Sequence, residues 1–133
     1  LEVARRNAIR NGVTVHFQQV DALQESWPSL NIDVLVSNPP YITEKERTDM
    51  ERNVLDWEPE LALFVPDNDP LLFYRHIARI GLDLLSPSGT LYYEINRAYG
   101  AETVSLLQQL GYHSVELRKD LSGNDRMVKA VKP

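Results

Sequence analysis

Four consecutive residues, Asn38-Pro39-Pro40-Tyr41, have the types and the spacing to hold an amino group. They follow the apolar run 32–37, which is typical of a buried strand, and the prolines end that strand because proline has no N–H to donate. Asn38 is therefore expected at the carboxyl end of a strand, where open α/β sheets bind their ligands. Its amide oxygen and a rigid backbone carbonyl could accept both hydrogens of an –NH2 group. The alternative is a strand-ending turn without a chemical role.

Three carboxylates outside this tetrapeptide are further candidates. Asp21-Ala22 ends an expected strand, and the Asp21 carboxylate either contacts a ligand or caps the following turn. Glu94 also ends an expected strand, where it faces either the substrate pocket or solvent. Glu58, which precedes Pro59, either orders a loop over the site or is a solvated acid. The three histidines lie far apart in the sequence, and no metal site is expected from them.

The elements that must position these residues alternate between helix and strand periodicity. Helices are expected over 1–12, 43–52, 69–85 and 100–110, and strands over 13–20, 32–37, 90–95, 113–119 and 126–132. This alternation predicts an α/β fold with a mostly parallel sheet, in which the last strand is antiparallel because only a short turn precedes it. The acidic, irregular stretch 42–68 is long for a plain connection and is expected to act as a lid or binding loop.

Composition excludes several classes of protein. The 133 residues are 43% apolar and 25% charged, which fits one globular domain at most. No run is long enough to cross a bilayer, and cysteine is absent, so we expect a cytoplasmic protein without a membrane partner. The net charge of −5 argues against a nucleic-acid surface, and the only local basic group, Arg5, Arg6 and Arg10, is expected to be a solvated helix face.

The order of the motifs resembles the peptide chain release factor N5-glutamine methyltransferase family. The runs that carry the resemblance, besides the tetrapeptide and Ile42, are Glu58-Pro59 with Ala62-Leu63, Leu71 to Arg75, Gly89 with Glu94, and Asp120 with Gly123, Asp125 and Arg126. The tetrapeptide alone indicates only methyltransferases that act on amino groups, and the downstream runs favour the narrower family. One departure is Asp69-Pro70-Leu71, where the family usually has a glycine before the leucine.

The resemblance implies a Rossmann-like, S-adenosylmethionine-dependent methyltransferase whose strands follow the order 3-2-1-4-5-7-6. It implies methyl transfer to the side-chain amide of the glutamine in the Gly-Gly-Gln motif of release factors, without a metal ion. The implied catalytic residues are Asn38, Pro39 and Tyr41; Pro40 and Glu94 join them in substrate binding; and Asp21, Ala22 and Asn38 are the implied cofactor-binding residues. Tyr41 is expected to pack against the substrate amide.

The resemblance also implies that residues 1–133 are the C-terminal part of a catalytic domain. The chain begins at Leu1, inside an expected helix, and has no counterpart of the family's glycine-rich cofactor turn or upstream helical domain. Without the first two strands, apolar edges would be bare, so we expect this chain alone to bind cofactor weakly, to be inactive and to self-associate.

Two alternatives remain at this stage. One is a DNA or RNA amino methyltransferase that flips an adenine, cytosine or guanine and stacks it on Tyr41. The other, from a different class, is a non-catalytic α/β piece that oligomerises.

Overall fold

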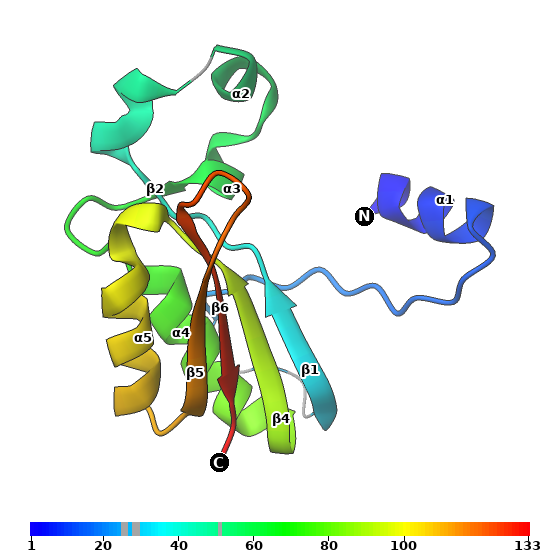
Figure 1. The fold of residues 1–133 in the computed structure, drawn as a ribbon. Coiled ribbons are helices and arrows are strands. Elements are labelled where there is room, and N and C mark those ends of the chain that lie inside the picture. Colours follow the sequence, from blue (N-terminus) through cyan, green and yellow to red (C-terminus); the bar gives the residue numbers. More distant parts are fainter. Residues whose placement is uncertain (25–26, 28–29, 51) are drawn as a thin grey trace.

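A four-stranded sheet forms the centre of the computed structural model, which describes residues 1–24, 27, 30–50 and 52–133, without the side chains of residues 52 and 53. Its strands are β1 (Ile32–Ser37), β4 (Leu85–Glu94), β5 (His113–Lys119) and β6 (Asp125–Val131), in the order β1-β4-β6-β5 (Figure 1). β1 is parallel to β4, and β6 is antiparallel to both β4 and β5. Three strands thus share one direction and the last opposes them. This confirms the expected α/β fold and the last four positions of the expected strand order.

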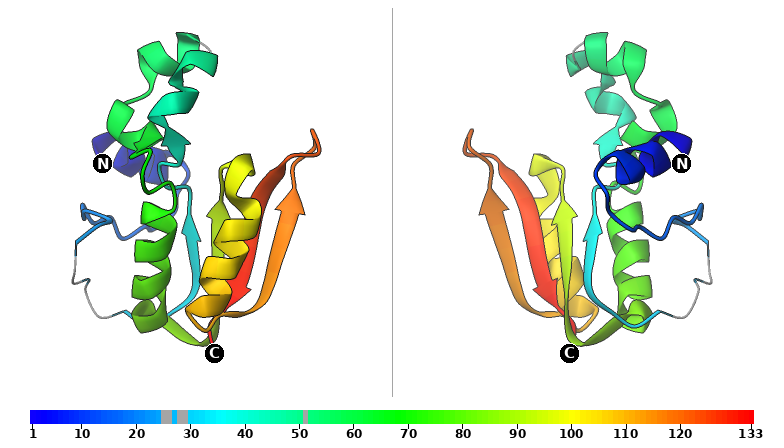
Figure 2. Two further views of the ribbon diagram at one scale, coloured as in Figure 1. Left: turned by 90° about the vertical axis from the view of Figure 1, so that its left-hand side faces the viewer. Right: turned by 90° about the vertical axis from the view of Figure 1, so that its right-hand side faces the viewer.

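Two helices, α4 (Leu72–Leu84) and α5 (Gly100–Gln109), cover one face of this sheet (Figures 1 and 2). The core lies between them and the sheet, where α4 and α5 place apolar side chains against alternate residues of the strands. The fully buried residues there include Tyr74, Ala78, Leu91, Tyr93, Ile95, Leu107, Val128 and Ala130. A short 3-10 helix, η2 (Arg97–Tyr99), joins β4 to α5.

α4 and β4 both begin at residues other than those predicted from the sequence. α4 begins at Leu72 and not at residue 69, and the Asp69 carboxylate does not cap it. Both Asp69 carboxylate oxygens instead accept hydrogen bonds from the Arg75 guanidinium, at 2.8 and 3.0 Å. β4 begins at Leu85 and not at residue 90. Residues 86–89, which lie between the expected helix and the expected strand, instead form an irregularity within β4, where Ser88 has φ +63° and the register against β1 shifts. A Cβ on Gly89 would lie 2.8 Å from the Ser86 carbonyl oxygen, so the irregularity requires glycine there.

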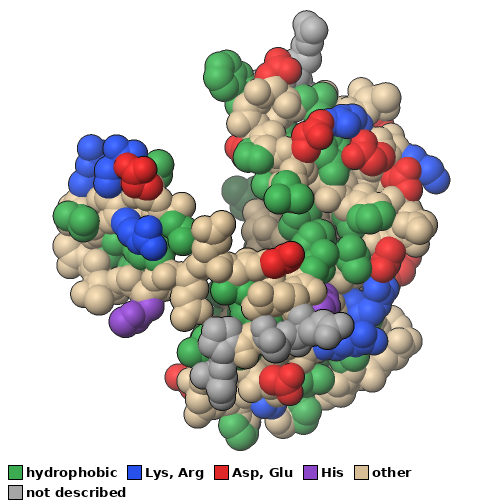
Figure 3. Space-filling view, turned by 180° about the vertical axis from the view of Figure 1, so that it is seen from behind, with side chains coloured by type: hydrophobic (Ala, Val, Ile, Leu, Met, Phe, Trp, Pro, Cys, Tyr) green, Lys and Arg blue, Asp and Glu red, His purple; other side chains and the backbone are tan. Residues whose placement is uncertain are grey.

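The N-terminal region departs most from expectation. α1 (Glu2–Arg10) forms as expected and ends at Asn11 and Gly12, which has φ +61°. Residues 13–20, however, are extended without forming a strand, so that prediction is wrong. A strand needs a neighbour to pair its N–H and C=O groups, and β1 is the edge of the described sheet, with no partner beyond it. α1 lies on the side of the sheet opposite α4 and α5, as a lobe apart from the body, and the extended segment leads from it past the edge of β1 back to the body (Figures 1 and 3).

The expected lid over 42–68 contains short elements. It comprises β2 (Ile42–Thr43), the 3-10 helix η1 (Glu44–Asp49), α2 (Arg52–Trp57), α3 (Glu60–Leu63) and β3 (Phe64–Val65). The helix expected over 43–52 is thus of the 3-10 type and ends at Asp49, and Glu51 lies outside the described residues. β2 pairs with β3 in parallel, so the beginning and the end of the lid lie side by side. Arg47 links η1 to the end of the lid: its guanidinium pairs with Glu60 and lies 4.6 Å from the centre of the Phe64 ring.

Within the described ranges, no helix combines the length and the apolar composition needed to span a bilayer.

Candidate active site at the carboxyl end of β1

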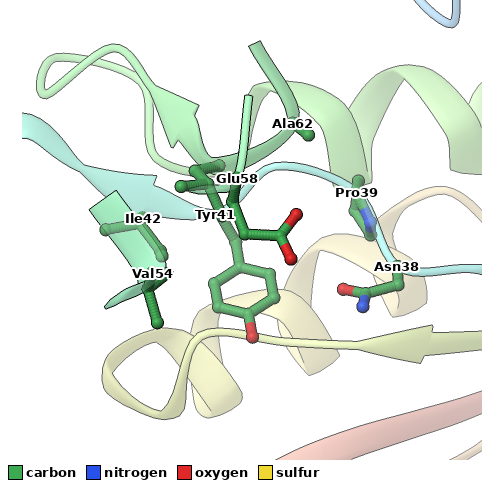
Figure 4. A pocket seen from close by; sticks show the side chains of 8 residues that line it. Asn38, Pro39, Tyr41, Ile42, Val54, Glu58 and Ala62 are labelled. Carbon is green, nitrogen blue, oxygen red and sulfur yellow. The ribbon is translucent and has the colours of Figure 1, made fainter. Parts of the chain in front are cut away.

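Asn38 lies where the sequence predicts it, directly after Ser37 at the carboxyl end of β1. Pro39 is buried and Pro40 is half-buried, so the backbone on the C-terminal side of Asn38 is fixed by packing, while the Asn38 side chain is exposed. In the described part of the chain, no residue forms a hydrogen bond with the Asn38 amide. Figure 4 shows this amide pointing into a pocket, toward Tyr41 and Glu58. The amide is therefore available to a ligand.

Two pockets meet at Asn38. The first has a volume of about 420 Å³ and is lined by Asn38, Pro39, Tyr41, Ile42, Val54, Glu58, Ala62 and Leu63. The second has a volume of about 600 Å³ and includes Asp21, Ala22, Asn38, Pro40 and Phe73 in its lining. Asn38 is thus shared by a pocket that holds the expected cofactor residues Asp21 and Ala22 and one that holds two of the expected substrate residues, Pro39 and Tyr41. Pro40, also expected to bind substrate, lines the second pocket instead. The lid contributes α2 and α3 residues to the first pocket, as its length suggested.

Tyr41 is oriented by Glu94. The Tyr41 hydroxyl donates a hydrogen bond of 2.7 Å to Glu94 Oε1, which brings together two expected site residues that are 53 positions apart. Partial burial, and then the hydrogen bond to the Glu94 carboxylate, raise the pKa of Tyr41 to about 12. The ring lines the first pocket (Figure 4), whereas Glu94 lies at the hydroxyl end of the ring. Glu94 is therefore neither a free strand-end acid nor a described lining residue of this pocket.

Arg126 lies near Tyr41, where its guanidinium donates two hydrogen bonds. Its Nε donates to Asp120 Oδ2 at 3.2 Å and its Nη1 to the Ile95 carbonyl at 3.3 Å. The Asn124 N–H, with a smaller contribution from Arg126, keeps the pKa of Asp120 below its usual value. Arg126 thus makes a contact across the turn at residues 120–125 and does not pair with Asp125, which instead pairs with Lys119 at 3.2 Å.

Asp21 takes up one of its two expected roles. Its Oδ1 accepts a hydrogen bond of 2.9 Å from the Leu23 N–H, which is the turn-capping arrangement. Asp21 and Ala22 nevertheless line the second pocket with Asn38, although they are far from it in sequence. Glu58 is exposed, and Figure 4 shows its carboxylate pointing into the first pocket between Tyr41 and Asn38.

Two residues of this neighbourhood were not found from the sequence. Asn96 is 4% exposed, and its Nδ2 donates to the Tyr41 carbonyl at 3.0 Å and to the Glu46 carboxylate at 2.9 Å. Glu46 also accepts from the Thr43 N–H and hydroxyl, at 2.9 and 2.8 Å. Thr43 and Glu46 have the spacing of a capping box, which is a signal that could have located Glu46. Asn96 is the N-cap of η2, where its Oδ1 accepts from the Ala98 N–H at 2.9 Å, but this local role gives no sign of its contact with Tyr41.

Similarity to known proteins extends along nearly the whole chain. A protein of Bacteroides thetaiotaomicron named release factor glutamine methyltransferase is 49% identical over 131 residues, which are 98% of this chain and 47% of that protein. A protein of Flavobacterium psychrophilum with the same name is 46% identical over 129 residues, 97% of this chain and 45% of that protein. By sequence, the chain belongs to the release factor glutamine methyltransferase family. It spans about half the length of the curated relatives it matches.

The fold agrees with this family assignment. A crystal structure of a methyltransferase from Pyrococcus furiosus superposes with a TM-score of 0.62 at 19% identity, covering 98% of this chain and 56% of that one. At that identity the likeness shows the fold alone, which is the Rossmann-like methyltransferase fold that the motifs implied. No protein-family model matches the chain.

Proposed function

We propose that the protein to which this chain belongs transfers a methyl group from S-adenosylmethionine to the side-chain amide nitrogen of a release-factor glutamine. Residues 1–133 would be the C-terminal part of its catalytic domain, and the protein would act in the cytoplasm. The observation that carries the proposal is the exposed Asn38 amide, which no described residue engages and which lines two adjoining pockets. The names of the relatives, release factor glutamine methyltransferase, support this choice of substrate.

Holding the substrate nitrogen is the task for which these residues are suited. A glutamine amide is a poor nucleophile because its nitrogen lone pair is delocalised into the carbonyl. The Asn38 Oδ1 and the Pro39 carbonyl would accept the two N–H groups and stabilise positive charge that develops on the nitrogen. Burial of Pro39 keeps this pair of acceptors rigid, so the amide is oriented before reaction and not during it.

Tyr41 would form the wall of the substrate pocket. Its hydroxyl is bound to Glu94, so the ring cannot swing into the pocket without losing that hydrogen bond. With its pKa raised to about 12, Tyr41 stays protonated at neutral pH and is not a general base. Glu58 and the lid residues would cover the bound side chain and limit its contact with water.

The second pocket fits the nucleoside end of the cofactor. Its lining combines the Asp21 carboxylate with apolar side chains such as Phe73, which suits a flat base that carries an amino group. S-adenosylmethionine, when bound, supplies an already activated methyl group. The chain has no glycine-rich turn for the methionine end, so we expect these 133 residues alone to bind the cofactor weakly and to be inactive.

The chain on its own would also associate through bare apolar surface. On the sheet face opposite α4 and α5, the exposed fractions of Val34 and Val36 are 53% and 71%. In the full-length protein the partner would be a release factor, with no membrane and no nucleic-acid partner.

The direct test is methyl transfer from labelled S-adenosylmethionine by the full-length protein, offered a release factor with and without its Gly-Gly-Gln glutamine. We expect label only in the factor that keeps the glutamine. Label entering DNA or RNA, and not the release factor, would instead identify an amino methyltransferase of nucleic acids.

The role of Asn38 has a matched control in the same assay. Asn38→Ala should lower kcat by about 10²–10³-fold, the usual cost of one preorganised polar contact, and should weaken cofactor binding far less, because Asn38 is only one of several residues that line the second pocket. Asn68→Ala removes an exposed amide from the end of the lid and should leave kcat unaltered. A wild-type rate for Asn38→Ala would exclude Asn38 from the mechanism.

A further inference from the structure

Tyr41 is held at both of its ends by the carboxyl end of β4. Glu94, the last residue of the strand, accepts from the Tyr41 hydroxyl at 2.7 Å, and Asn96, two residues later, donates to the Tyr41 carbonyl at 3.0 Å. Asn96 is not a described lining residue of either pocket that contains Asn38. It therefore acts on the site only indirectly, through the Tyr41 carbonyl and through Glu46.

We infer that Asn96 and Glu46 are positioning residues for the methyl transfer: together they clamp the backbone of residues 41–43, and so fix the Tyr41 wall relative to the Asn38 acceptor. This inference rests on the proposed function, because its effect is felt by the substrate amide.

One side of the clamp is anchored in the core. Asn96 is 4% exposed, and its backbone N–H donates to the Tyr74 hydroxyl at 3.0 Å. Tyr74 is 1% exposed on α4, and its own carbonyl accepts from the Tyr93 hydroxyl at 2.9 Å. The Asn96 Oδ1 is also engaged, by the Ala98 N–H at 2.9 Å. Asn96 consequently has no freedom to rotate its amide without breaking several hydrogen bonds.

The other side of the clamp is the Glu46 carboxylate. Glu46 Oε2 accepts from the Thr43 N–H, the Thr43 hydroxyl and Asn96 Nδ2, at 2.9, 2.8 and 2.9 Å. Hydrogen bonds to a carboxylate are stronger than those between neutral groups, and they satisfy a charge that is only partly exposed. The Asn96 amide thus donates hydrogen bonds to the Tyr41 carbonyl and to the Glu46 carboxylate. These two acceptors lie on either side of the backbone that runs from Tyr41 to Thr43.

The clamped backbone forms a partition between two pockets. Tyr41 and Ile42 line the 420 Å³ pocket on one side, and on the other side a polar pocket of about 250 Å³ that also contains Glu46, Asn96 and Arg126. If the clamp opens, this partition moves and the substrate pocket changes width. Displacements near 1 Å cost about 10²-fold in rate where reacting atoms must be aligned.

The first test replaces Asn96 in the full-length protein. Asn96→Ala should lower kcat by about 10- to 100-fold with the release factor, with less change in KM and none in cofactor affinity. Tyr112→Phe is the matched structural control, because it removes a buried hydrogen bond of 2.7 Å to the Ala78 carbonyl, away from the pockets. Equal losses of kcat in the two variants, at comparable loss of Tm, would show a merely structural role and overturn the inference.

The second test separates the two bonds of the Asn96 amide. Asn96→Asp places a carboxylate against Glu46 and should lower both Tm and kcat. Adding Glu46→Gln supplies an amide that can donate to the new carboxylate, so Tm should recover. The Tyr41 carbonyl still has no donor, so kcat should stay low. Recovery of kcat together with Tm would overturn the inference.

The inference and the proposed function fail in different ways. If the wild-type protein methylates the release factor and Asn96→Ala does so at the same kcat, only the inference is lost. If the wild-type protein methylates no release factor, the proposed function fails and the positioning role fails with it.

Discussion

α4 and α1 are both amphipathic helices, but they differ completely in what they bury. α4 buries Tyr74, Ile77, Ala78, Ile80, Gly81 and Leu84, of which the first three belong to the core cluster with the sheet, whereas α1 has no buried residue. Ile9 on α1 has an exposed fraction of 78%, and Ile77 on α4 has one of 8%. The same periodicity therefore forms both helices, and only the presence of a sheet face decides which one is stabilised by burial.

Two parts of the candidate site differ in the same way. The residues around Asn38 and Tyr41 are attached to the packed side, through Pro39 and through Glu94 and Asn96 at the end of β4. The expected cofactor residues, Asp21 and Ala22, follow the extended segment of the unpacked N-terminal region. The part of the site that is expected to bind the substrate is therefore held more firmly than the part that is expected to bind the cofactor.

The largest contrast should appear when the two isoleucines are truncated. Ile77→Ala should lower the free energy of unfolding by about 2–5 kcal/mol, because it leaves a cavity in the core. Ile9→Ala should change it by less than about 0.5 kcal/mol. Urea unfolding of both variants measures the difference, and equal losses would mean that α1 packs as tightly as α4 in solution.

Two tyrosines test the contrast through hydrogen bonding. Tyr74→Phe removes the acceptor of the Asn96 N–H and should cost about 1–3 kcal/mol, because a buried donor is left unsatisfied. Tyr92→Phe, on the open face of the sheet, where Tyr92 is 40% exposed, should cost about 0.5 kcal/mol or less. Thermal unfolding compares the two, and a larger loss for Tyr92→Phe would contradict the assignment of the packed face.

The role of the sheet face opposite α4 and α5 can be tested by measuring self-association of the chain. Val36→Lys places a charge on the bare face of β1 and should weaken self-association of the 133-residue chain by about tenfold or more. Gln108→Lys adds the same charge on an exposed position of α5 and should have no such effect. Sedimentation of both variants over a range of concentrations provides the measurement. A monomeric wild-type chain would show that the face is not used.

The smallest effect is expected from the ion pair before α4. Hydrogen bonds from Arg75 lower the pKa of Asp69, so this pair stabilises the fold above the unfolded pKa near 3.9 and loses that contribution as the pH falls through the folded pKa. The side chains of both residues are about one-third exposed, at 32% and 34%, so Asp69→Asn should cost only about 0.5–1 kcal/mol at pH 7.

The pH dependence provides the check on that ion pair. The difference between Asp69→Asn and the wild-type chain should shrink as the pH falls through the folded pKa of Asp69, which lies below its usual value. Asp56→Asn, a substitution at an exposed position, is the control. A difference that does not change with pH would point to the hydrogen bonds of the neutral side chain as its source.

Elements whose signals are local could be predicted from the sequence. The helices at 100–110 and 1–12 end at glycines with positive φ, and the hairpin at 120–125 has turn formers, so their observed bounds differ by one or two residues from expectation. The strand at 13–20 could not be predicted correctly, because its alternation is real but its pairing depends on a neighbour. The 3-10 type of η1 and the irregularity within β4 were not predicted, because turn formers such as Ser88 and Gly89 mark a break without saying whether the strand resumes beyond it.

The sequence by itself determined that a strand stops at Asn38 with its amide at the sheet edge, because two prolines permit no other continuation of that strand. It also determined the family, through the spacing of motifs along the chain. Only the tertiary structure decided what Tyr41 binds and how it is held. Glu94, Asn96 and Glu46 reach Tyr41 or its neighbours because β4 lies beside β1 and the lid returns at β3, and hydrogen bonds between such distant residues leave no periodic trace in the sequence.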